Sequence, residues 1–101
     1  MSASDALFQL SVMTPEKTVY AGKIRSLMAP GEAGYFGILA GHAPFLSTLV
    51  QGNIRIKEPD GKSVEFFSTG KGFLEVLNNE TTILLSQVQE LPATAAQSMG
   101  H

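Results

Sequence analysis

The chain has 101 residues, of which 44% are apolar and 16% are charged, and this composition is typical of one packed globular domain. The formal net charge of −2 gives no electrostatic footprint for nucleic acid or for anionic lipid, so these partners are not expected. The absence of cysteine excludes disulfides, thiolate metal sites and a thiol nucleophile.

The opening residues, 1–6, are polar and lack the apolar stretch of a signal peptide. Apolar and polar side chains then alternate over 7–13, which predicts a strand. Residues 14–17 contain a proline that ends this strand, and the β-prone piece 18–20 follows. No apolar run approaches the ~20 residues that cross a bilayer, so any membrane association is expected to come through a partner.

The middle of the chain is rich in glycine and less regular. An imperfect alternation predicts a strand over 23–29, and the four glycines within 31–41 predict short strands separated by sharp bends. Residues 41–46 are expected to form an ordered loop before a strand at 47–50, because proline at 44 favours extended backbone in the residue before it.

The second half of the chain predicts hairpins. Pro59-Asp60-Gly61 combines a fixed φ, a local hydrogen-bond acceptor and a free φ, which is typical of a turn between two strands. Glycine and asparagine clusters at 69–72 and 78–80 predict two further turns. The strands expected around these turns are 53–57, 63–67, 73–77 and 81–88.

The strand pattern predicts an all-β protein with about nine or ten short strands, arranged as a flattened sandwich or barrel. We expect a single domain over residues 1–92, because Pro92 ends the pattern. The small, polar residues 93–101 are expected to form a flexible tail.

Catalytic and cofactor sites are not predicted. His42 lies in a conspicuous loop, but the only other histidine is His101, so a polar loop or interface residue is favoured over a metal ligand. The glycines at 69–72 have neither the spacing nor the following helix of a phosphate-binding loop. No nucleophile motif is present. A hidden pair of carboxylates remains open, but most acidic side chains, such as Glu58, Asp60, Glu65 and Glu80, fall at turns or on polar strand faces, which favours a solvated surface.

The stretch 35–46 is unusually long and apolar, and two interpretations of it remain open. It is either an irregular core segment or an exposed apolar patch that binds a partner. Composition does not decide between them.

Four segments of the sequence form a recognisable set in this order: Thr14-Pro15-Glu16, Gly31 to Leu46, Gly72-Phe73-Leu74-Glu75-Val76 and Thr82-Ile83-Leu84-Leu85. The most specific part is Gly-His-Ala-Pro preceded by Gly-x-Phe-Gly-Ile. Together the segments resemble the epsilon subunit of F-type ATP synthases, and the resemblance runs from about Phe8 to about Val88.

This resemblance implies a ten-stranded β-sandwich that serves as a non-catalytic rotor subunit of the central stalk, binds the gamma subunit and the c-ring, and couples ion translocation to ATP synthesis. It implies one copy per complex, no cofactor, and a peripheral location on the cytoplasmic face of a bacterial membrane. Many relatives continue into a helical hairpin that restrains ATP hydrolysis. Because few residues follow Pro92 in this sequence, we expect no C-terminal helical domain, no self-contained brake and no nucleotide site.

Carried over position by position, the resemblance implies two contact surfaces. Many family members have an acidic residue where this chain has Tyr35, so a charged contact to the c-ring is expected to be replaced by an apolar or hydrogen-bonding one. The c-ring residues are Glu32, Gly34 and Tyr35, and the gamma residues are Thr14, His42, Phe45 and Ser47.

Two other functions remain open from the residues alone. One is a free-standing β-sandwich that binds a small ligand or a peptide at an exposed sheet edge. The other is an enzyme that uses a hidden carboxylate pair.

Overall fold

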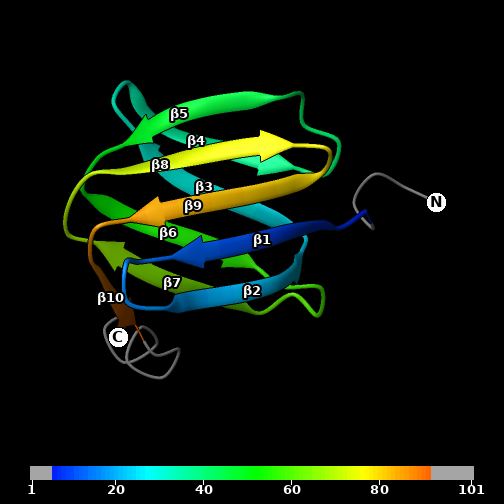
Figure 1. Cartoon of the computed structure of the whole chain (residues 1–101). Coiled ribbons are helices and arrows are strands. Elements are labelled where there is room, and N and C mark those ends of the chain that lie inside the picture. Colours follow the sequence, from blue (N-terminus) through cyan, green and yellow to red (C-terminus); the bar gives the residue numbers. More distant parts are fainter. Residues whose placement is uncertain (1–5, 92–101) are drawn as a thin grey trace.

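The computed structural model describes residues 6–91, and all regular structure within this range is β-strand, as expected (Figure 1). No helix in this range is long and apolar enough to cross a membrane. The tail expected at 93–101 and the domain boundary expected at Pro92 lie outside the described range. The strands are β1 (Phe8–Met13), β2 (Thr18–Ile24), β3 (Ser26–Gly31), β4 (Gly34–Leu39), β5 (Phe45–Leu49), β6 (Gly52–Lys57), β7 (Ser63–Ser68), β8 (Gly72–Leu77), β9 (Glu80–Leu85) and β10 (Val88–Leu91).

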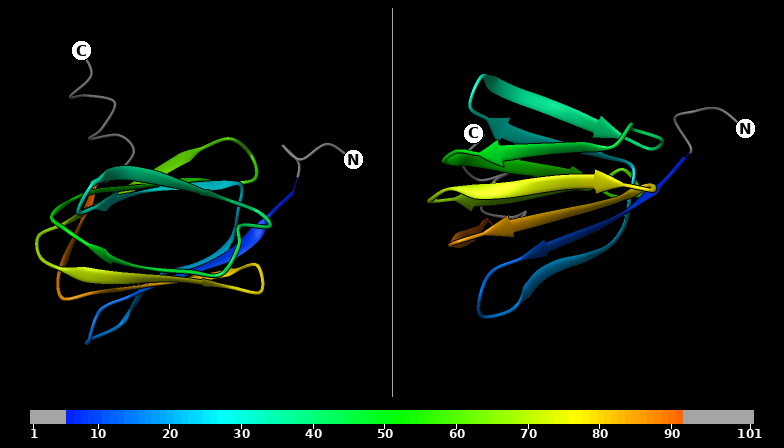
Figure 2. Two further views of the ribbon diagram at one scale, coloured as in Figure 1. Left: turned by 90° about the horizontal axis from the view of Figure 1, so that it is seen from above. Right: turned by 45° about the horizontal axis from the view of Figure 1, so that its top comes forward.

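The strands form one curled sheet whose two halves face each other as the layers of a sandwich (Figure 2). One layer has the order β4-β3-β6-β7-β10, and the other has the order β5-β8-β9-β1-β2. The layers join where Gly31 of β3 pairs with Leu49 of β5. The strands pair antiparallel except β1 and β9, which are parallel.

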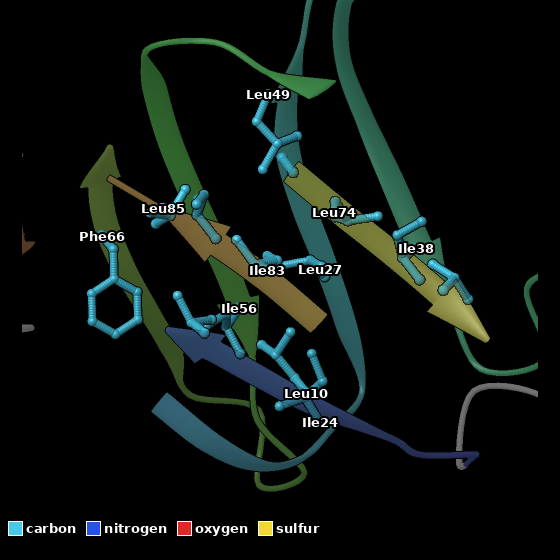
Figure 3. Close-up of a cluster of buried hydrophobic side chains, with 14 of the residues drawn as sticks. Leu10, Ile24, Leu27, Ile38, Leu49, Ile56, Phe66, Leu74, Ile83 and Leu85 are labelled. Atoms are coloured by element: carbon cyan, nitrogen blue, oxygen red, sulfur yellow. The ribbon is translucent and has the colours of Figure 1, made fainter. Parts of the chain in front are cut away.

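The core fills the space between the two layers, where buried apolar side chains from both layers meet (Figure 3). Ile54 and Leu74, from opposite layers, are fully buried. Full burial of such a side chain stabilises the fold by roughly 1.5–3 kcal/mol. The buried apolar residues are Phe8, Leu10, Val12, Ile24, Leu27, Ala29, Ile38, Leu49, Ile54, Ile56, Phe66, Leu74, Val76, Ile83 and Leu85.

The glycine-rich segment is more regular than expected. The predicted series of bent pieces within 31–41 is wrong, because β3 and β4 form a tight hairpin in which Gly31 pairs with Gly34. Gly34 has a φ of 129°, which a residue with a side chain rarely adopts, and this glycine lets the chain reverse so sharply. The predicted start of the next strand at 47 is also wrong, since β5 begins at Phe45.

The strand predicted over 81–88 is divided in two. β9 ends at Leu85 between β8 and β1, whereas β10 begins at Val88 and pairs with β7 in the other layer. The chain therefore crosses from one layer to the other after β9. Ser86 and Gln87 interrupt the apolar alternation at the crossing, but two polar residues alone do not show that the next strand joins the other layer.

The hairpin predicted around Pro59-Asp60-Gly61 is confirmed. β6 and β7 pair from Gly52 with Ser68 to Lys57 with Ser63. In the turn, the Lys62 N–H donates to Asp60 Oδ1 at 2.9 Å, and Gly61 has a φ of 93°. The local acceptor and the free φ that predicted the turn are the features that form it.

Candidate functional site

Most of the predicted contact residues gather where the β3–β4 hairpin approaches β5. A single hollow lies between these elements. Residues that the resemblance assigns to two different partners are therefore neighbours on one side of the sandwich. Of the residues predicted as contacts, the hollow is lined by Glu32, Gly34, Tyr35, Phe45 and Ser47.

His42 belongs to the same region through its contact with Phe45. The two rings are 5.4 Å apart in an edge-to-face arrangement, and Phe45 in turn meets Phe36 at 5.5 Å. His42 Nδ1 lies 2.8 Å from the carbonyl oxygen of Ala43, so a local backbone contact orients the ring. Within residues 6–91 no group of three potential metal ligands occurs, and His42 is placed as part of an aromatic cluster.

The corner that carries His42 is held by a side chain from a distant turn. The Gly41 N–H donates to Asn79 Oδ1 at 2.8 Å, and Asn79 Nδ2 donates to the Leu7 carbonyl at 3.0 Å. Asn79 thus links the β4–β5 loop, the β8–β9 turn and the segment before β1. The sequence placed Asn79 in a turn but did not predict these two side-chain hydrogen bonds.

Tyr35 lies across β3, and its hydroxyl accepts a hydrogen bond from the Asn53 N–H of β6 at 2.9 Å. The residue nevertheless remains 56% exposed. A Cβ at Gly52 would fall 2.8 Å from this hydroxyl, so the glycine provides the space for the tyrosine. The ring therefore presents a flat, partly apolar surface in a fixed position.

Thr14 is not brought together with the other predicted residues. It begins the β1–β2 turn, where its N–H donates to the Lys17 carbonyl at 2.9 Å. β5 and β9 are both antiparallel to β8, and β1 is parallel to β9, so β1 and β5 run in the same direction. Thr14 follows the end of β1, whereas His42 precedes the start of β5, and the two residues lie at opposite ends of this layer.

Sequence reasoning missed an apolar surface on the outer side of β5, β8 and β9. Leu46, Phe73 and Leu84 lie on these adjacent strands and are 70%, 54% and 49% exposed. They line one hollow together with Glu75 and Thr82. We call Leu46, Phe73 and Leu84 the apolar face.

The sequence did contain a signal for this face. In β8 the buried residues are Leu74 and Val76, so Phe73 and Leu77 occupy the alternate positions that normally carry polar side chains. Large apolar residues at solvent-facing positions of adjacent strands indicate a surface that another molecule covers.

The hydrogen-bonded pair of Tyr20 and Glu58 lies away from this region, beside the β6–β7 turn. The Tyr20 hydroxyl donates to Glu58 Oε2 at 2.6 Å. Burial, followed by the hydrogen bond and by the charges of Glu58 and Asp60, raises the pKa of Tyr20 well above its ordinary value. Glu65, in turn, is paired with Arg55 at 2.8 Å. These contacts account for carboxylates that the sequence left as candidates for a hidden pair.

Comparison of the sequence with known families gives one match that spans most of the chain. Residues 7–90 match the family described as ATP synthase, Delta/Epsilon chain, beta-sandwich domain. The ATP synthase epsilon chain of Chlorobaculum tepidum is 40% identical over 88 residues, which cover 87% of this chain and 99% of that protein. The epsilon chain of Desulfatibacillum aliphaticivorans is 42% identical over 80 residues, which cover 79% of this chain and 56% of that protein.

Solved structures share the fold at low sequence identity. A chain of the Euglena gracilis mitochondrial ATP synthase structure with OSCP, F1 and c-ring superposes with a TM-score of 0.80 at 18% identity, covering 94% of this chain. A chain of the Tetrahymena thermophila central stalk and c-ring structure gives 0.70 at 19% identity, covering 81%. This chain spans 60% and 65% of those two chains.

Proposed function

The chain belongs to the ATP synthase epsilon-chain family, and we propose that it is a non-catalytic rotor subunit that binds gamma and the c-ring and couples ion translocation to ATP synthesis. The observation that carries this proposal is the apolar face on β5, β8 and β9. Single exposed apolar residues are ordinary on protein surfaces, but Leu46, Phe73 and Leu84 are contiguous and line one hollow. Burial against a partner would remove this apolar surface from water.

We assign the apolar face to gamma. Phe45 and Ser47 are the neighbours of Leu46 along β5, but they point to the other side of the strand, toward the hollow beside the β3–β4 hairpin. A gamma surface that covered the apolar face and passed over the edge of β5 would therefore reach these residues as well. At the other end Met13 pairs with Leu84, and Thr14 follows Met13 directly. A gamma surface that lay along this layer would therefore reach from Thr14 to Phe45, although the two residues do not touch each other.

We assign the β3–β4 turn to the c-ring. Glu32 and Gly34 are exposed at this turn, and Tyr35 follows with its hydroxyl already bonded to the Asn53 N–H. The turn therefore offers one carboxylate and one rigid aromatic surface to a polar loop. Because the hollow beside it also contains Phe45 and Ser47, the two partners would meet along this edge of the sandwich.

This role places the chain at the membrane through its partners. We propose one copy per complex, held on the cytoplasmic face of a bacterial membrane by gamma and the c-ring. No cofactor is assigned, because binding and positioning are sufficient for the proposed role.

Calorimetric titration of the chain into the gamma subunit of the same organism tests the assignment of the apolar face. We expect saturable one-to-one binding that Phe73→Ser weakens by about 30-fold, since truncation of a central interface residue typically costs about 2 kcal/mol. Phe67→Ser is the matched control, because Phe67 is partly exposed on the outer side of β7 in the other layer, away from β4 and β5. Equal losses for the two variants, or binding unchanged by Phe73→Ser, would show that the apolar face is not the gamma contact.

A further inference from the structure

We infer that the free edge of β4 is a pairing site for an extended segment of the gamma subunit. This inference rests on the proposed function and adds a backbone contact to the side-chain contacts of the apolar face. In the described part of the chain, β4 pairs with β3 and with no other strand. One side of β4 therefore carries backbone groups without a strand partner.

The backbone groups that face this edge follow from the register. The Pro30 carbonyl accepts the Val50 N–H at 2.9 Å, so Pro30 directs its backbone away from β4. Pro30 pairs with Tyr35, and backbone direction alternates along an antiparallel strand, so Tyr35, Gly37 and Leu39 point to the free edge. The Leu39 carbonyl accepts the His42 N–H at 3.2 Å, as this direction requires.

The β4 edge lacks the features that normally prevent strand addition. Its sequence, GYFGIL, contains no charged residue and no proline. By contrast, the edge strand β2 carries Lys23 near its end, follows Lys17, and pairs with β1 through an irregular register at Val12/Met13. Charges and bulges of this kind protect an edge strand, and their absence from β4 leaves it able to pair.

The neighbouring β5 edge is shorter. Its end is already joined to β3 through Gly31 and Leu49, and the Thr48 carbonyl accepts the Ser47 hydroxyl at 3.0 Å. β4 therefore offers the longer row of unpaired groups. The occupant that satisfies alternating N–H and C=O groups is an extended polypeptide backbone.

A hollow beside Gly37 adds a side-chain preference. Met28, Gly37 and Leu39 line this hollow, and Arg55 and Lys57 form its far side. Because Gly37 has no side chain, an apolar side chain of the added strand can lean over it toward Met28. The segment that fits is extended and uncharged, with an apolar residue opposite Gly37.

The position of β4 identifies gamma as the source of this segment. β4 begins at the β3–β4 turn and ends at the loop that carries His42, which contacts Phe45. The proposed gamma surface reaches Phe45, so the free edge of β4 continues it. Backbone hydrogen bonds are directional, so pairing here would fix the rotational position of the sandwich on gamma. Apolar contacts are non-directional, so the apolar face alone would define this position less strictly.

Residue-resolved amide hydrogen exchange of the full chain, alone and with gamma, tests the inference. We expect the Tyr35 and Gly37 amides to exchange at least tenfold more slowly in the complex. If gamma binds while these amides exchange as in the free chain, the edge inference fails and the proposed function stands. Protection of Leu46 and Thr48 in their place would move the pairing to β5 and overturn it, whereas absence of gamma binding would count against the proposed function itself.

A pair of variants at Gly37 provides a second test. A Cβ at this position would lie 3.7 Å from the Leu27 carbonyl oxygen and 3.9 Å from Met28 Sδ, which are ordinary contacts. Gly37→Ala keeps the N–H, whereas Gly37→Pro removes it from the free edge without removing a bond to β3. We expect Gly37→Pro to weaken gamma binding about tenfold relative to Gly37→Ala, and equal affinities in two folded variants would contradict the inference.

Sedimentation of the chain alone distinguishes gamma from a second copy as the occupant. We expect a monomer at micromolar concentration for the natural sequence and for Gly37→Pro. A dimer that Gly37→Pro dissociates would show that β4 pairs with its own copy, and this result would overturn the assignment to gamma.

Discussion

At the scale of single residues, Asn79 positions the loop that carries His42, one of the proposed gamma contacts. It has a φ of 62° in the β8–β9 turn, and its side chain bonds both Gly41 and Leu7. Asn78, beside it, has a φ of 52°, and the two residues form a turn of the kind that favours asparagine and glycine. Variants at Asn78 and Asn79 can therefore distinguish the contribution of the turn conformation, which both residues share, from that of the two Asn79 side-chain hydrogen bonds.

We predict that Asn79→Gly destabilises the fold by about 1–3 kcal/mol, because the turn remains favourable while two hydrogen bonds are lost. Asn78→Gly is the control, since glycine also adopts a positive φ and the two Asn79 side-chain hydrogen bonds remain. Urea unfolding measures both variants. Similar stability of the two variants would mean that the Asn79 side-chain hydrogen bonds contribute nothing beyond the turn conformation.

Tyr20 makes the stability depend on alkaline pH. The pKa of Tyr20 is raised in the folded state, whereas an unfolded tyrosine titrates near its ordinary value of about 10. Above this pH the unfolded chain releases a proton that the folded chain retains, so the stabilising contribution is present below about pH 10 and falls as pH rises. Its partner Glu58 accepts the hydrogen bond that holds the proton in place.

We therefore predict that Tyr20→Phe flattens the alkaline loss of stability. The lysines titrate in both proteins, so the difference between their urea midpoints at pH 8 and at pH 10.5 isolates Tyr20. The advantage of the natural chain over the variant should shrink at the higher pH. A constant difference would show that the hydroxyl contributes equally in both conditions and that its pKa is not raised.

At the scale of strands, close approach between neighbours restricts particular glycines. A Cβ at Gly72 would fall 2.6 Å from the Leu84 carbonyl oxygen, so β8 and β9 could not keep their present separation there. We predict that Gly72→Ala destabilises the fold by about 1–3 kcal/mol, as overpacking does elsewhere. Gly37→Ala, with ordinary contacts at its Cβ, should change stability by less than about 1 kcal/mol. Thermal unfolding compares them, and equal effects would contradict the proposed packing at Gly72.

Alternation and turn chemistry predicted the strands because both are local properties. The β6–β7 hairpin is the clearest case, since Pro59-Asp60-Gly61 determines its own turn. The break between β9 and β10 was missed because strand partners come from distant segments, which local alternation does not encode. β4 was predicted as broken because glycine weakens a strand, yet its pairing with β3 maintains six residues of strand.

The candidate site was only partly predictable for the same reason. Family resemblance supplied His42, Phe45 and Ser47, but Leu46, Phe73 and Leu84 come from three strands whose adjacency is a result of folding. The apolar residues of β8 at alternate positions were visible in the sequence. Their meaning depends on which side faces the core, and only the assembled sandwich determines that.

At the scale of the whole molecule, the two layers separate stability from recognition. The inward side chains form a continuous core, while the outer side of β5, β8 and β9 carries the apolar face. The β3–β4 turn and β4 belong to the other layer and approach β5, the edge strand of the layer that carries this face. The sandwich can therefore act as a rigid body that contacts one partner with a sheet and another with a turn.

The coupling of ion movement to ATP chemistry that we propose for this chain can be measured by ATP-driven ion pumping. The assay uses epsilon-depleted ATP synthase of the same organism in sealed vesicles, with and without the full chain. We predict that the chain raises the number of ions pumped per ATP hydrolysed, and that Phe73→Ser requires about 30-fold more protein for the same effect. A folded chain that binds gamma one to one and leaves this ratio unchanged would contradict the account.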